Sequence, residues 1–169
     1  MSILVTGAAG FIGSNLCDAL LRGGHEVLGV DNLNNYYDPA LKEARLERLH
    51  RREGFAFERM DLTDQVAMEG LRDRGIGPIV HLAAQAGVRH SISHPFVYAD
   101  ANLTAWLEVL ELARAVETPH LLFASSSSVY GANESLPFSS SDTVDRPLSL
   151  YAATKRAGEL LAHSYAHLY

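Results

Sequence analysis

The chain has 169 residues, 47% apolar and 20% charged, which fits one domain with a substantial core. Twenty acidic residues against 14 Lys and Arg give a formal charge of −6, which argues against nucleic acid or an anionic membrane as a general partner. One cysteine excludes an internal disulfide framework, and no apolar run is long enough to span a bilayer. No signal peptide is visible at the N-terminus, so we expect a soluble, cytoplasmic protein.

Short apolar, β-branched runs alternate with longer amphipathic segments along the whole chain. We expect strands at residues 3–6, 27–31, 55–61, 79–83 and 120–125, and helices at 13–22, 41–52, 64–73, 98–116 and 150–168. Such alternation, with strands apolar throughout, predicts a parallel sheet covered by helices on both faces. The predicted fold is therefore α/β, with a doubly wound parallel sheet in a single domain, residues 1–169.

The expected helix at 41–52 is rich in Lys and Arg. These cations suit an anion-binding strip, but Glu43 and Glu47 are interleaved with them and favour a solvated face with local ion pairs. The histidines His163 and His167 share a helix face at the spacing of a zinc pair. Ser164 stands where a metalloprotease needs glutamate, and no third ligand suggests itself, so we predict no metal site.

Three glycines, Gly7, Gly10 and Gly13, follow the first expected strand in the motif VTGAAGFIG. Glycine permits a tight turn, close approach of the backbone to a pyrophosphate, and close packing of helix on strand. The helix that begins here offers unpaired N–H groups and the positive end of its dipole to an anion. The spacing departs from the G-x-G-x-x-G fingerprint, so these glycines alone are also compatible with a plain strand–helix turn.

Acidic residues end the second and third expected strands. Asp31 stands where a carboxylate can accept hydrogen bonds from an adenosine ribose, and it would repel a 2′-phosphate, so NAD is favoured over NADP. Asp61 is placed to lie beside the adenine, although it can equally be a turn-forming residue. Together with the glycine turn, Asp31 predicts a dinucleotide-binding domain.

Hydroxyl and amine groups follow the fifth expected strand. The serine run 125–128 comes at a strand end, where ligands bind in open α/β sheets, although serines there are also ordinary loop residues. Tyr151 and Lys155 are four residues apart on the last expected helix and therefore share a face. A nearby ammonium, the helix N-terminus and an oxidised nicotinamide each favour a phenolate, which can take a proton from a carbinol while hydride leaves. Alone, this pattern is common on helices.

Five ordered motifs, VTGAAGFIG, DNLNNYYDP, HLAAQAGVR, ASSSSVYG and SLYAATK, cover essentially the whole chain. The chain resembles the extended short-chain dehydrogenase/reductase family of nucleotide-sugar epimerases and dehydratases, and most of all its uronate branch, the UDP-glucuronate 4-epimerases. The resemblance implies a Rossmann-type NAD-binding domain and a UDP-sugar substrate. It also implies that a C-terminal substrate lobe is absent, so we expect weak or no turnover by these residues alone.

The resemblance assigns roles by position. Tyr151 would be the base, Lys155 its electrostatic partner and a cofactor ligand, and Ser126 a hydrogen-bond partner of the sugar 4-hydroxyl, with Ser127 and Ser128 beside it. Arg89 would face a uronate carboxylate, with a surface salt bridge as the alternative. Tyr36 and Tyr37 resemble a loop that covers the cofactor, with turn packing as the plainer interpretation. The implied cofactor-binding residues are Gly7, Gly10, Phe11, Ile12, Gly13, Asp31, Asn32, Asp61, Leu62, Leu82, Ala83, Ala84, Ala86, Tyr151 and Lys155.

The implied reaction is transient oxidation at C4 of the sugar, rotation of the ketone and return of hydride to the opposite face by retained NAD. Related dehydratases carry acidic residues where Ser127 and Ser128 stand, which favours epimerisation here. The alternatives are an NAD-dependent UDP-sugar decarboxylase or dehydratase and, in another class, a non-catalytic NAD-binding module. The helices at 98–116 and 150–168 would form a homodimer face or pack on the sheet.

Overall fold

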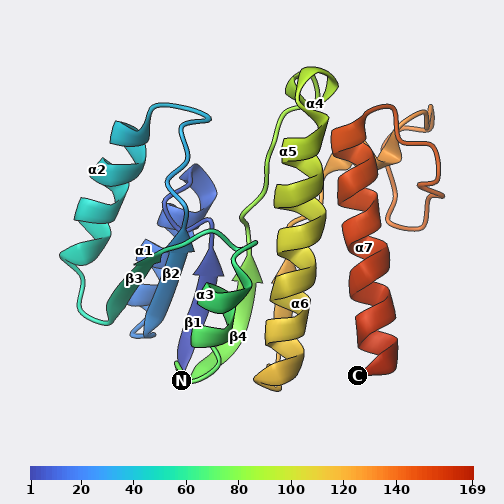
Figure 1. Ribbon diagram of the computed structural model, residues 1–169. Coiled ribbons are helices and arrows are strands. Elements are labelled where there is room, and N and C mark those ends of the chain that lie inside the picture. Colours follow the sequence, from blue (N-terminus) through green and yellow to red (C-terminus); the bar gives the residue numbers. More distant parts are fainter.

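The computed structural model describes residues 1–169. The strands are β1 (Ser2–Thr6), β2 (Val27–Asp31), β3 (Phe55–Arg59), β4 (Ile76–His81) and β5 (Leu121–Phe123). All neighbouring strands are parallel, and their order across the sheet is β3-β2-β1-β4-β5. β1 is thus central, with connections leading outward in both directions. The predicted doubly wound parallel sheet is confirmed (Figure 1).

Nine helical segments connect the strands and follow the last one. The α-helices are α1 (Phe11–Arg22), α2 (Pro39–His50), α3 (Gln65–Gly70), α4 (His90–Ser93), α5 (Pro95–Ala99), α6 (Ala105–Ala115) and α7 (Leu150–Leu168). A π-helical turn, η1 (Asp100–Thr104), joins α5 to α6, and a 3-10 turn, η2 (Ser127–Tyr130), follows β5.

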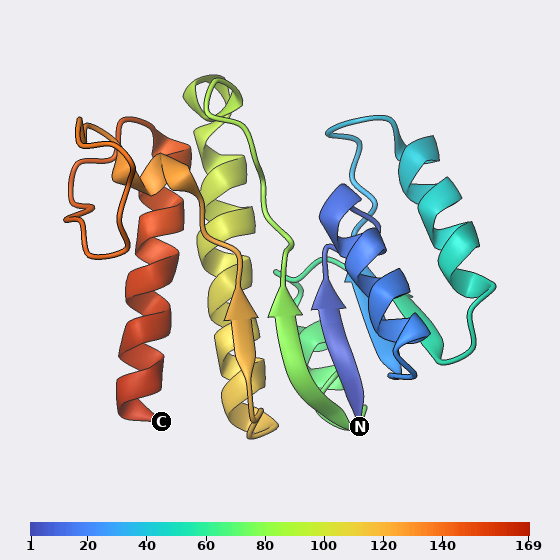
Figure 2. The same ribbon diagram turned by 180° about the vertical axis from the view of Figure 1, so that it is seen from behind.

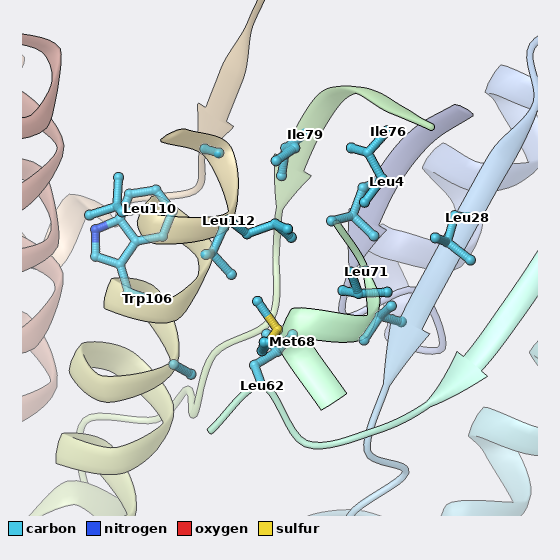
Figure 3. Packing of buried hydrophobic residues seen from close by; sticks show 14 residues of the cluster. Leu4, Leu28, Leu62, Met68, Leu71, Ile76, Ile79, Trp106, Leu110 and Leu112 are labelled. Carbon is cyan, nitrogen blue, oxygen red and sulfur yellow. The ribbon is translucent and has the colours of Figure 1, made fainter. Parts of the chain in front are cut away.

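The two faces of the sheet bury separate apolar clusters. On one face, Leu4 and Ile79 from the strands pack with Met68 of α3 and Trp106 of α6 (Figure 3). Leu161 of α7 also packs against this cluster. On the other face, Val5 of β1 packs with Cys17 of α1 and Leu49 of α2. The view from behind shows α1 in front of the sheet (Figure 2). Because β1 and β2 are covered on both faces, they carry apolar residues in succession.

Local signals explain several helix ends. The Asp38 side chain accepts a hydrogen bond from the Ala40 N–H, and Pro39 occupies the first turn, so α2 begins before the expected residue 41. The Ser149 side chain accepts from the Ala152 N–H and starts α7, whose bounds match the expected 150–168.

Other bounds differ from expectation. β3 ends at Arg59, not at 61, because Asp61 leaves the sheet and accepts hydrogen bonds from the Thr63 N–H and hydroxyl. β4 begins at Ile76 and ends at His81, and β5 is confined to Leu121–Phe123, which are in register with Ile79–His81 of β4. The helix expected at 13–22 is α1, which begins two residues earlier, at Phe11. The helix expected at 64–73 is α3, which is shorter and ends at Gly70. The helix expected at 98–116 begins earlier, with α5 at Pro95, continues through the π-helical turn η1 and ends with α6 at Ala115.

Candidate active site

A cavity of about 540 Å³ lies at the carboxyl ends of the central strands. This edge of a doubly wound sheet, where the connections diverge, is the usual ligand site of the fold. Nine of the expected cofactor-binding residues line it: Gly7, Gly10, Asp31, Asn32, Asp61, Leu62, Leu82, Ala83 and Ala84. The other six, Phe11, Ile12, Gly13, Ala86, Tyr151 and Lys155, are outside the lining, and Phe11 and Ile12 have exposed side chains at the start of α1.

The glycine turn is closed so tightly that side chains would not fit. Gly7 has φ 71°, and a Cβ there would lie 2.8 Å from the Ala83 nitrogen. A Cβ on Gly13 would lie 2.1 Å from the Gly7 carbonyl oxygen. The turn therefore requires glycine at both positions, and it brings the N-terminus of α1 against the end of β1, an arrangement suited to binding an anion.

Asp31 is a preorganised acceptor at the end of β2. Its carboxylate accepts hydrogen bonds from the backbone N–H groups of Ala9 (3.2 Å) and Leu33 (2.9 Å), and Lys42 Nζ lies 3.1 Å away. Asp31 is 7% exposed and Lys42 5%. A buried carboxylate held by three donors is rigid and keeps lone pairs for a further hydroxyl, as the prediction of a ribose ligand requires.

The solvated face expected for residues 41–52 is present at the exposed Glu43, Glu47 and Arg48, but Lys42 and Arg45 depart from it. Lys42 points into the fold and also donates to the Asn34 side chain (3.2 Å). Arg45 donates to the Ala9 carbonyl (3.2 Å) and to the Tyr37 hydroxyl (2.9 Å). These cations clamp the β2–α2 loop to the glycine turn, and Lys42 and Tyr37 line the cavity. Sequence reasoning missed Lys42 because its partner is reached only through tertiary packing.

A second polar cluster lies at the end of β3. The Asn32 side chain donates to Asp61 (2.9 Å), which also accepts from Thr63. Burial would raise the pKa of Asp61, but these hydrogen bonds outweigh it and lower the pKa. Asp61 is thus both a turn former and a cavity-lining carboxylate.

Lys155 is buried beside the serine run. It is 4% exposed, and Nζ donates to the Ala124 carbonyl (2.9 Å) and lies 5.0 Å from the centre of the Phe123 ring. Burial lowers its pKa to about 8, so the ammonium is retained at neutral pH. Tyr151 precedes it by one turn of α7.

The serines have different environments. The Ser126 hydroxyl accepts a hydrogen bond from the Ser128 N–H (3.2 Å) and caps η2. The Ser125 hydroxyl instead donates to Glu159 of α7 (2.5 Å), so it is directed away from the other serines. Ser127 is exposed, and Ser128 is half-buried. Arg89 is exposed and makes no ion pair, so the surface salt bridge considered for it is wrong.

Asn102, in the π-helical turn, is a buried residue that sequence reasoning missed. Its side chain accepts from the Gln85 N–H (2.8 Å) and donates to the Gln85 carbonyl (3.0 Å) and to the Thr154 hydroxyl (3.0 Å). Thr154 lies between Tyr151 and Lys155 on α7. Asn102 thereby fixes the helix that carries both groups to the loop that follows β4.

His81 is a buried neutral histidine at the end of β4. It hydrogen-bonds the Thr6 hydroxyl through Nδ1 (2.8 Å) and stacks on Trp106 (ring centres 4.8 Å apart). Burial, and secondarily the charge of Lys155, lowers its pKa to about 3. The uncharged ring adds no repulsion to the Lys155 ammonium.

Comparisons with known proteins agree with this geometry. Residues 3–169 match the model of the NAD dependent epimerase/dehydratase family. The chain belongs to this family. It is 53% identical to a 37.6 kDa protein of Escherichia coli O111:H- and 49% identical to a probable UDP-glucuronate 4-epimerase of Rhizobium meliloti, in each case over the whole chain. It spans 51% and 50% of those two proteins, about half the length of the curated relatives it matches.

A solved structure extends the agreement to three dimensions. UDP-glucuronic acid 4-epimerase from Bacillus cereus, in complex with UDP-glucuronic acid and NAD, superposes with a TM-score of 0.89 at 37% identity. The match covers 99% of this chain and 53% of that one. NAD is the cofactor of the family, and the resemblance inferred from the five sequence motifs is confirmed.

The residues at the cavity fit NAD. The glycine turn leaves backbone N–H groups free of side-chain obstruction at a helix N-terminus, as a pyrophosphate requires. The buried Asp31 carboxylate suits a ribose with free hydroxyls. None of the helices is both long and apolar enough to cross a membrane.

Proposed function

We propose that the protein carrying this chain is a nucleotide-sugar 4-epimerase that interconverts UDP-glucuronate and UDP-galacturonate with tightly held NAD. The observation that carries the proposal is the buried Lys155 ammonium, bonded to the carbonyl of Ala124 just before the serine run and one turn after Tyr151. A dinucleotide-binding module without catalysis has no need of this arrangement. The names of the R. meliloti and B. cereus relatives support the uronate as substrate.

The proposed NAD site follows the cavity from one end to the other. The Asp31–Lys42 pair would hold the adenosine ribose, with Asn32, Asp61 and Leu62 beside the adenine. Leu82, Ala83, Ala84 and Ala86 would lie along the cofactor toward its nicotinamide end. The start of α1 would hold the pyrophosphate through Gly7, Gly10, Phe11, Ile12 and Gly13.

The chemistry requires a base close to a fixed positive charge. When bound, NAD would supply the acceptor for the hydride that leaves C4 of the sugar and would be the source of its return to the opposite face. Tyr151 would remove the proton of the 4-hydroxyl and later give it back. The Lys155 ammonium would stabilise the phenolate. Ser126 would hydrogen-bond the 4-oxygen, with Ser127 and Ser128 at the sugar and Arg89 facing its carboxylate.

We propose residues 1–169 as the dinucleotide-binding domain, with further substrate contacts made by residues outside them.

We also propose a homodimer in which two copies of the protein meet through α6 and α7, where Leu107 and Leu160 are exposed. Sedimentation velocity of the longest natural form, with Leu160→Glu as the variant, tests this contact. A monomer in the wild type would exclude it.

The deciding experiment is incubation of the longest natural form with NAD and UDP-glucuronate, followed by NMR of the sugar nucleotide. UDP-galacturonate as product is expected from the wild type and not from Tyr151→Phe, which should still retain NAD. A decarboxylated pentose would make the protein a decarboxylase. Unchanged substrate with NAD bound would contradict the uronate assignment.

A further inference from the structure

Tyr98 of α5 is a fully buried tyrosine outside the cavity. Its exposure is 0%, and it is not among the cavity-lining residues. It lies between the loop that follows β4 and the first turn of α7, where Tyr151 stands. Burial raises the pKa of Tyr98, so this phenol stays protonated and does not compete with Tyr151 as a base.

The Tyr98 hydroxyl anchors the ring. It donates a bifurcated hydrogen bond to the carbonyl oxygens of Ala86 (2.7 Å) and Gly87 (2.6 Å). Gly87 has φ 103°, a conformation that L side chains rarely adopt, so the turn that presents these two carbonyls depends on glycine. With its hydroxyl bonded and its ring fully buried, Tyr98 has one available orientation.

The fixed ring touches Tyr151. The ring centres are 6.1 Å apart and the planes cross at 76°, an edge-to-face contact within the preferred range for aromatic pairs. Tyr151 lies in the first turn of α7, after the Ser149 cap. The Tyr151 hydroxyl makes no hydrogen bond in the structure, and the Thr154 hydroxyl bonds only the Tyr151 carbonyl, not its side chain. The Tyr98 ring therefore restricts the direction of the Tyr151 side chain.

We propose that Tyr98 is a positioning residue that holds the Tyr151 phenol in the orientation needed for proton transfer. The inference rests on the proposed function in one respect, the role of Tyr151 as base. Small displacements of a reacting group lower rates steeply. Loss of the Tyr98 ring should therefore lower turnover without weakening the binding of substrate or NAD.

Two substitutions in the longest natural form separate the ring from its hydroxyl. Tyr98→Leu removes both, and we expect kcat to fall about tenfold or more while KM for UDP-glucuronate and the NAD content stay within about twofold. Tyr98→Phe keeps the ring, and we expect kcat within about threefold of the wild type. Tyr98→Met is a second variant without a ring, should Tyr98→Leu not fold. Tyr165→Phe, which removes a hydroxyl bonded to Glu111 far along α7, is the matched control and should leave kcat unchanged.

An unchanged kcat in the ring-less variant overturns the proposal. An equal loss of kcat in Tyr98→Phe and Tyr98→Leu also overturns it, because the effect would then belong to the hydroxyl and its loop. A rise in KM that accounts for the lost activity would assign Tyr98 to binding and would likewise contradict the proposal.

A measurement without substrate keeps this inference separate from the proposed function. In protein labelled with 3-fluorotyrosine, the ¹⁹F signal of Tyr151 is identified by its absence in Tyr151→Phe. We expect one sharp signal in the wild type and in Tyr98→Phe, and a split or broadened one in Tyr98→Leu. A single sharp signal in Tyr98→Leu would overturn the positioning role even if the wild type proves to be an epimerase. Failure to epimerise UDP-glucuronate, with the expected spectra, would refute only the proposed function.

Discussion

The Lys42–Asp31 ion pair is expected to contribute more to stability than the exposed pairs of the molecule. Lys42→Met keeps most of the apolar stem and removes the charge, leaving the buried Asp31 carboxylate with only the N–H donors of Ala9 and Leu33. Removing one partner of a buried pair typically costs about 3–5 kcal/mol. Because two donors remain and the adjoining cavity admits water, we expect a loss of about 2–3 kcal/mol in the free energy of unfolding.

A double-mutant cycle isolates the interaction itself. Asp31→Asn leaves the Lys42 ammonium with the Asn34 side chain as its remaining acceptor. The double variant leaves no unpaired charge, so its loss should be smaller than the sum of the two single losses by about 2 kcal/mol. Urea denaturation of the longest natural form without NAD measures all four proteins.

The matched control is the Arg22–Asp18 pair of α1, in which the Arg22 side chain is 62% exposed. Arg22→Met should cost less than about 1 kcal/mol, because solvent screens the attraction. If Lys42→Met lowers the free energy of unfolding by no more than Arg22→Met does, the reasoning that burial strengthens the Lys42–Asp31 pair is refuted. A coupling energy near zero in the double-mutant cycle would refute it as well.

Three further outcomes are expected. Gly13→Ala places a Cβ against the Gly7 carbonyl and should cost about 3 kcal/mol in urea denaturation and abolish NAD retention, measured by absorbance. Because burial lowers the pKa of Lys155 from 10.5 to about 8, the unfolded chain binds more protons between these pH values; stability relative to Lys155→Met should rise with pH across that window, and a flat difference would contradict it. Trp106→Phe removes the indole hydrogen bond to the Gly158 carbonyl (3.0 Å) and should cost about 1–2 kcal/mol in the same assay.

Elements specified by local signals were predictable from the sequence. α7 combines the Ser149 cap with an apolar stripe, and β2 is apolar up to Asp31, so both have their expected bounds. The π-helical turn was not predictable, because the side chain of Asn102 bonds the backbone of Gln85 and the hydroxyl of Thr154. These partners are remote in sequence and leave no local periodicity.

The residues of the candidate site divide in the same way, into those that the sequence predicts and those that only the tertiary structure reveals. Gly7 and Asp31 were predictable because a turn and a strand end impose their residue types. Lys42 and Tyr98 were not, since a lysine in a basic helix and an aromatic residue at a helix start each have a simpler interpretation. Only the packing of α2 on the glycine turn and of α5 on α7 gives them partners.

The central strand, β1, is also the first of these five strands in the order of synthesis. The β2 partner of β1 follows it closely in the chain, but the partner of its other edge, β4, is synthesised much later. The Thr6–His81 hydrogen bond spans 75 residues, which take roughly 4–15 s to translate. Until then one edge of the apolar β1 is unpaired and open to pairing with a strand of another chain.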